Sequence, residues 1–185
     1  MNFKLGKIQS KTIRIGFIFR VLTVLIILNA CGSNSGEDVP DFGMFEAVVS
    51  GEFNQEFSGV AIFGVQQLGP PTGNIFVLSM NSTGSNDVVF AVNVALSTEN
   101  RPQNGSTALG ELNSGAHGEF VFFNPGESQQ NFRSVSGQLI ITSSSSENLE
   151  GEVSFNAIYS NNDTEVNVQA TFNATCTPQS IVICD

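Results

Sequence analysis

The sequence has no tryptophan, a single tyrosine (Tyr159) and a single histidine (His117), and it has no lysine after Lys11. The shortage of tryptophan and tyrosine argues against a sugar-binding site built on flat aromatic platforms. Metal binding is a poor alternative, because no second cysteine pair exists besides Cys176 and Cys184, and His117 is the only histidine. The same shortage leaves few side chains that work as a general base near neutral pH. We therefore expect a protein without cofactor or metal and without enzymatic activity.

Positive charge is almost confined to the first 20 residues. The whole chain has 7 basic and 17 acidic side chains, and all the acidic ones follow residue 36. After residue 30 only Arg101 and Arg133 are basic, so residues 31–185 carry a formal charge of −15. Such a surface repels phosphate backbones, which excludes nucleic acid as a partner.

Residues 1–30 have the composition of a cleaved targeting segment with a signal helix. Five basic residues precede the apolar run Val21–Leu28, which is only eight residues long. A membrane-spanning helix needs roughly 20 apolar residues, whereas the apolar core of a signal peptide needs about 7–15. The length of the run therefore favours a signal peptide.

The apolar run ends in Leu28-Asn29-Ala30-Cys31, which resembles the lipobox of bacterial lipoproteins. The resemblance implies cleavage before Cys31 and attachment of lipid to that cysteine. Two or more acyl chains give a stable membrane anchor. The Gly/Ser-rich, acidic residues 31–41 that follow are typical of a flexible tether. We expect the chain to be anchored in the cell envelope, in the outer membrane, on its periplasmic or surface face.

Two further cysteines, Cys176 and Cys184, remain after lipidation of Cys31. Export places them in a compartment that permits disulfides. We expect a bridge between them that fixes the C-terminal tail; the alternative is a pair of free thiols.

From residue 42 onward the hydrophobic pattern has a period of two. In Asp87–Leu96, Glu152–Tyr159 and Thr164–Ala174, apolar side chains occupy alternate positions, which indicates strands with one buried face and one solvated face. Glycine, asparagine and proline clusters separate these runs. Further strands are predicted at Phe45–Ser50, Phe57–Gly64, Asn74–Met80, Glu119–Phe123, Val135–Thr142 and Ile181–Ile183.

This arrangement predicts one all-β domain over residues 42–185, an antiparallel sandwich or barrel of about 8–9 strands. The segment Ser136–Thr175 also resembles the closing region of small, mostly uncharacterised envelope lipoproteins. There a Gly-x-Leu-x-Ile-Thr strand leads through a serine-rich turn to two final strands. The resemblance implies an all-β fold and brings no catalytic residues with it.

Three groups of residues could carry chemistry. His117 is expected in an exposed, glycine-flanked loop, where a hydrolase would need a serine and a carboxylate beside it. Glu150 and Glu152 share one face of a strand at a spacing that an inverting glycosidase pair also has, but we interpret them as residues of a solvated sheet face. Asn161-Asn162-Asp163 and Asn86-Asp87 lack the calcium-loop pattern, so we interpret them as turn residues.

Three functions follow in order of preference. The first is a lipid-anchored envelope lipoprotein with an interaction or structural role, whose partners are the membrane and a protein of the envelope. The second is a calycin-like carrier that holds a small apolar ligand inside a barrel lined with phenylalanine. The third is a hydrolase that uses His117.

Overall fold

The computed structural model describes residues 42–67, 73–83, 87–98, 100–176 and 182–184. The predicted signal peptide, Cys31 and the predicted tether lie outside the described residues. No helix within the described ranges has the length and hydropathy that crossing a membrane would require.

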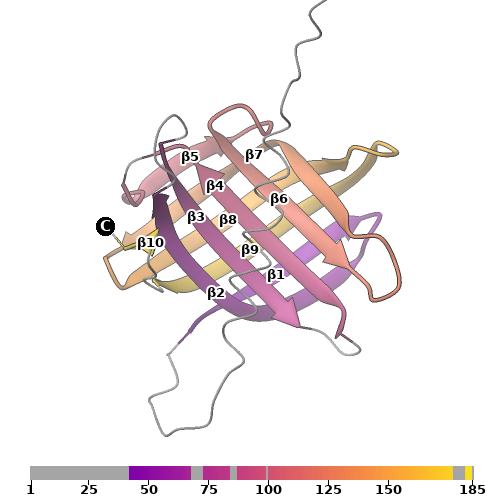
Figure 1. Ribbon diagram of the computed structural model, residues 1–185, viewed down its shortest axis with the longest axis horizontal. Helices are drawn as coiled ribbons and strands as arrows, with labels where there is room; N and C mark the ends of the chain where they lie inside the picture. Colours follow the sequence, from indigo (N-terminus) through magenta and orange to yellow (C-terminus); the bar gives the residue numbers. More distant parts are fainter. Residues whose placement is uncertain (1–41, 68–72, 84–86, 99, 177–181, 185) are drawn as a thin grey trace, which may run out of the picture. The chain divides into compact units, whose positions relative to one another are not determined.

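The described residues form an all-β fold (Figure 1). The strands are β1 (Gly43–Gly51), β2 (Gln55–Gln67), β3 (Asn74–Thr83), β4 (Val89–Leu96), β5 (Gly105–Leu109), β6 (Ala116–Phe123), β7 (Gln130–Ser144), β8 (Asn148–Tyr159), β9 (Thr164–Cys176) and β10 (Val182–Ile183). Except for the short β5, the barrel strands coincide with runs of alternating or continuous apolar residues between turns.

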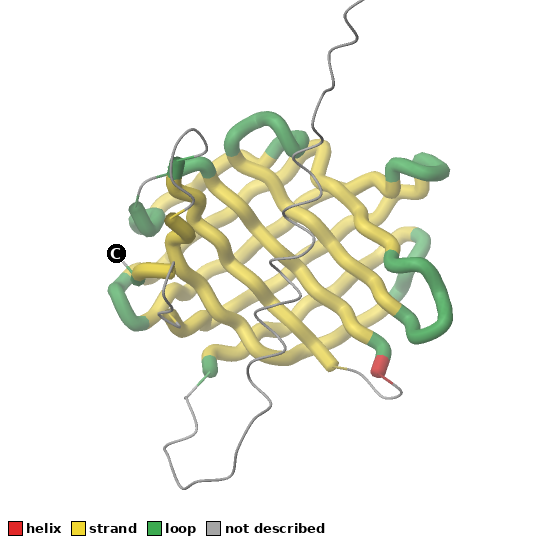
Figure 2. The backbone as a smooth tube through the Cα atoms, viewed as in Figure 1, coloured by secondary structure: helices red, strands yellow, loops and turns green. Residues whose placement is uncertain are grey.

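Eight of these strands close into an antiparallel barrel. Neighbours along the chain pair in turn from β1 to β4, then through β6, β7, β8 and β9, and β9 returns to pair with β1. The near wall, with β3, β4 and β6, crosses the far wall, with β8 and β9, as Figures 1 and 2 show. The sequence left sandwich and barrel open, and the β1–β2 and β1–β9 pairings decide for the barrel.

The inward face of each barrel strand carries the apolar side chains that the period of two predicted. On β9, the inward positions from Val166 to Ala174 are all 5% exposed or less, and on β8 Val153, Phe155 and Ala157 are 2% exposed or less. Phenylalanine supplies much of the volume, because Phe45, Phe76, Phe120, Phe132 and Phe155 are among the largest fully buried side chains.

Two glycines make room for one of these rings. A Cβ atom on Gly118 would lie 2.8 Å from ring carbons of Phe155, and a Cβ on Gly137 would lie 2.4 Å from the Cβ of Phe155. Strands β6 and β7 therefore approach the Phe155 side chain more closely than any larger residue would allow. Glycine inside a strand commonly marks such a close approach.

The sequence-based elements differ from the structure most clearly at β5 and β7. Strand β5 was not predicted: it is short, only Leu109 in it is buried, and it pairs with β7 alone. The strand predicted over Val135–Thr142 is longer, because β7 continues past a bulge between Ser134 and Ser136 to pair with both β6 and β5.

The backbone confirms the turn interpretation at Asp163 and Asp87, whereas Asn86 lies outside the described residues. Asp87 and Asp163 have φ angles of 59° and 58°, the left-handed region in which aspartate and asparagine are tolerated better than most residues. Asp163 lies in the β8–β9 hairpin, where the side chain of Asn162 accepts a hydrogen bond from the Thr164 amide.

The phenylalanine core gives a first prediction about stability. Phe120 on β6 is fully buried and contacts the rings of Phe53, Phe57 and Phe132, whereas Phe123 on the same strand is 37% exposed. We expect Phe120→Ala to lower the free energy of unfolding by about 3–5 kcal/mol, because it leaves a cavity in the core. Phe123→Ala should cost less than about 1 kcal/mol. Denaturant titration of both variants checks this, and equal losses would contradict the core assignment.

Candidate functional site

An open hollow of about 820 Å³ lies on the outer face of the barrel. It crosses five neighbouring strands in the order β2, β1, β9, β8 and β7. The strand registers place its outward side chains in two adjacent rows. The first row contains Ser58, Glu46, Thr171, Glu152 and Ile140, and the second contains Glu56, Val48, Gln169, Ser154 and Gln138.

Carboxylates dominate the charge of this hollow. Glu46, Glu56 and Glu152 are exposed, and no lysine or arginine is among its lining residues. Arg101 and Arg133, the arginines of the described residues, make their contacts outside the hollow. Arg101 donates hydrogen bonds to the Cys184 carbonyl and the Ser144 hydroxyl, and Arg133 lies opposite Glu119 on β6.

A ladder of amide side chains continues from one edge of the hollow. Gln169 donates a hydrogen bond to Asn167 (3.0 Å), and Asn167 donates to Asn156 (2.9 Å). Asn156 in turn donates to the Ser136 hydroxyl at 3.4 Å. The ladder orients the Gln169 side chain in the hollow, because the hydrogen bond to Asn167 fixes the position of the Gln169 amide nitrogen.

Exposed apolar side chains accompany the carboxylates. Val48 lies inside the hollow and is 47% exposed, and Met44 and Val60 lie opposite each other across β1 and β2 and are 58% and 36% exposed. Sequence reasoning missed this site, because it depends on which strands pair and in which register.

The glutamates that the sequence singled out behave as residues of a solvated sheet face. Glu150 and Glu152 are both exposed on β8, as expected from the period of two. Glu152 belongs to the hollow, whereas Glu150 accepts a hydrogen bond of 3.4 Å from Asn173. They therefore contribute negative charge to the outer face.

His117 is not in a loop, which corrects the expectation from its glycine-flanked sequence. It is half-buried as the second residue of β6, paired with Ala95 on β4. The nearby serine hydroxyls are engaged with the backbone. Ser134 donates to the Gly110 carbonyl and accepts from the Gly118 amide, and Ser114 donates to the carbonyls of Glu111 and Ala116. These contacts support a structural role for this corner of the barrel.

The environment of His117 lowers its pKa below the ordinary value of 6.5. Burial is the larger cause, because it disfavours the charged ring, and the positive charge of Arg133 adds to it. The folded protein therefore keeps this histidine neutral at pH values where an unfolded chain already binds a proton.

The barrel interior, where an apolar ligand would lie in a carrier, is occupied by side chains. Phe53, from the β1–β2 turn, packs against Phe120, Phe122 and Phe132, with ring centroids 5.1–6.0 Å apart. Deeper residues such as Leu78, Met80 and Val168 are fully buried. Phenylalanine rings thus fill the interior space, whereas in a carrier they would line an empty cavity.

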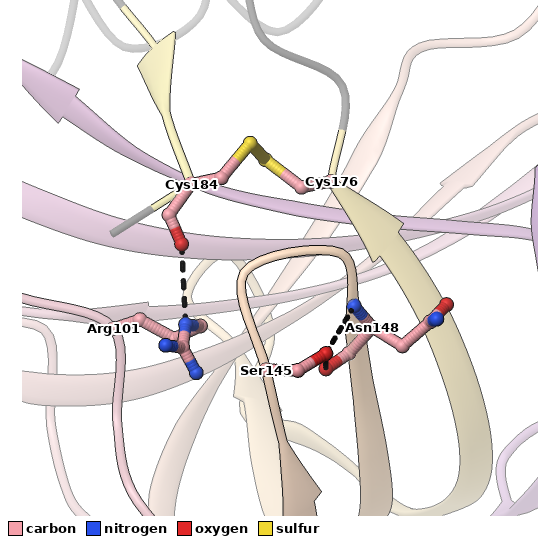
Figure 3. The surroundings of a disulfide bond; sticks show 5 residues. All are labelled: Arg101, Ser145, Asn148, Cys176 and Cys184. Atoms are coloured by element: carbon pink, nitrogen blue, oxygen red, sulfur yellow. Dashed lines mark hydrogen bonds between the residues drawn. A yellow bond between two sulfur atoms is a disulfide. The ribbon is translucent and has the colours of Figure 1, made fainter.

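The predicted disulfide between Cys176 and Cys184 is confirmed, with Cα atoms 5.7 Å apart (Figure 3). It joins the end of β9 to the residue that follows β10, and β10 pairs with β2. The Arg101 guanidinium binds the Cys184 carbonyl at 3.1 Å, and nearby the Ser145 hydroxyl accepts from the Asn148 amide at 2.9 Å (Figure 3). This cluster holds the C-terminal strand on the barrel.

No family model matches the chain, and neither a curated protein nor a solved structure matches it. Within the described ranges, no three histidine, cysteine, aspartate or glutamate side chains gather as they would to hold a metal ion. The proposed function therefore rests on the geometry of the barrel and its outer face.

The lowered pKa of His117 predicts a dependence of stability on pH. Well above pH 6.5 the ring is neutral in both states and contributes nothing. As the pH falls below 6.5, the unfolded chain binds a proton first, so the free energy of unfolding decreases until the pH reaches the lower folded pKa. His117→Asn should remove this component. Denaturation at pH 7.5 and 5.5 checks it, and an identical pH dependence in both proteins would contradict the burial argument.

Proposed function

We propose that this chain is a lipid-anchored lipoprotein of the cell envelope and that its barrel works through its outer surface, in binding or in a structural role. The lipobox-like Leu28-Asn29-Ala30-Cys31 supports the anchor, and the acidic, lysine-free residues 31–185 then form the tethered part. The observation that supports the outer surface as the place of interaction is the interior of the barrel, which is filled by side chains.

The contrast between the inside and the outside of the barrel supports this function over a carrier. A carrier needs a lined but empty interior, and here the inward side chains contact one another and are nearly all buried. The outer face instead offers an open hollow with exposed polar and apolar side chains. A ligand or partner would find contacts on the outside without rearranging the core.

The contacts around His117 also favour a non-enzymatic role. A serine hydrolase needs a serine hydroxyl that gives its proton to the histidine. The hydroxyl protons of Ser114 and Ser134 are donated to backbone carbonyls. A neutral, half-buried histidine beside an arginine is consistent with packing on the barrel wall.

The anchor is tested by labelling cells that express the full chain with a radioactive or alkyne-tagged fatty acid. We expect the label on the wild-type chain and mass spectra that begin at a modified Cys31. Cys31→Ser should lose the label and retain residues 1–30, because the modified cysteine is the point of attachment and cleavage. Cys176→Ser is the matched control and should keep the label. An unmodified Cys31, or a chain that begins elsewhere, would contradict the proposal.

A further inference from the structure

We propose that the outer hollow across β2, β1, β9, β8 and β7 binds a short, extended, lysine- or arginine-rich segment of another protein. This inference deepens the function proposed above, on which it rests, because it names the chemistry of the partner. Three properties of the hollow carry it: its length, its charge and its exposed apolar side chains.

The length of the hollow suits an extended peptide. Five adjacent strands span four inter-strand spacings, which is ~19 Å at ~4.8 Å each. An extended chain advances ~3.3 Å per residue, so about six residues cross the hollow from β2 to β7. The two rows of outward side chains, one beginning at Ser58 and the other at Glu56, run in this direction.

The charge of the hollow selects a cationic partner. Glu46 and Glu152 flank Thr171 in one row, and Glu56 lies in the next row opposite Val48. Glu46 and Glu152 lie two inter-strand spacings apart, ~9.6 Å, whereas alternate side chains of an extended peptide lie ~6.6 Å apart on one face. The long, flexible side chains of lysine and arginine span the difference of ~3 Å. No basic side chain of the barrel lines the hollow to compete with them.

The remaining lining residues complete the fit. Val48 and Ile140 offer apolar contact to the aliphatic stems of lysine or arginine, while Gln138, Ser154 and the oriented Gln169 offer hydrogen bonds to a peptide backbone. Anionic ligands are repelled by the three glutamates. A sugar would lack an aromatic platform, because the Phe57 ring turns inward to contact Phe45 and Phe90.

The test uses the full chain in neutral detergent and a fluorescein-labelled Lys-Ser-Lys-Ser-Lys-Ser peptide, with binding followed by fluorescence anisotropy. We expect saturable binding that weakens as salt is added. The triple variant Glu46→Gln, Glu56→Gln, Glu152→Gln should weaken binding at least tenfold. The control Glu127→Gln, Glu147→Gln, Glu165→Gln removes the same charge from exposed positions outside the hollow and should change affinity less than threefold.

A second pair of variants tests the position of the site. Val48→Arg places a cation in the middle of the hollow, and Val135→Arg places the same charge on β7, where the side chain is 41% exposed and outside the hollow. Only Val48→Arg should abolish binding, with both variants as stable as the wild type. Equal effects within either pair, or the absence of binding to the wild type, would overturn the proposal.

The same measurement on a chain that begins at Gly32 separates this inference from the lipid anchor. This chain lacks the lipidated cysteine and also the five basic residues of the first 30 positions, which Cys31→Ser retains. The hollow lies on the barrel, so loss of the lipid should leave the affinity for the peptide unchanged. A binding site that disappears with the lipid would contradict its assignment to the barrel face. Conversely, a chain that is lipidated but does not bind the peptide would refute the hollow and leave the anchor standing.

Discussion

The rest of the structure depends on the pairing of β1 with both β2 and β9, which closes the barrel. Strand β1 pairs with β2 on one side and with β9 on the other, so residues more than 100 positions apart, such as Phe45 and Phe172, become neighbours. Closure creates an interior, and the phenylalanine-rich inward faces fill it. Burial of this apolar surface is the main favourable term that stabilises such a fold.

Because the interior is filled, we look for a binding site on the outer face of the barrel. Most outward positions that line the hollow on β1, β2, β7, β8 and β9 are polar or acidic, with Val48 and Ile140 as the apolar exceptions, and closure brings them together in two continuous rows. The charge of this surface follows from the sequence, since only two basic side chains occur after residue 30. The same closing strand therefore forms the core on its inner face, through Phe45, and the candidate site on its outer face, through Glu46 and Val48.

The sequence predicted which face of each strand is buried better than it predicted which strands pair. Alternation placed Val153, Phe155 and the apolar residues of β9 inside, because a half-buried strand has a period of two. It missed β5, whose five residues bury little, and it placed His117 in a loop because of the glycines around it. The hollow was out of reach, since the approach of Glu46, Glu56 and Glu152 depends on the register of several strand pairs, which alternation alone does not fix.

Methyl-labelled NMR spectra of the full chain, recorded with increasing amounts of a fatty acid, test the central claim that the interior of the barrel is filled and takes up no apolar ligand. The account predicts that the methyl signals of fully buried Leu78, Val94 and Val168 stay unchanged. Methyl signals of the exposed Val48 serve as the reference for contact with the outer face. A saturable shift of the buried signals would show a ligand inside the barrel and would contradict the account.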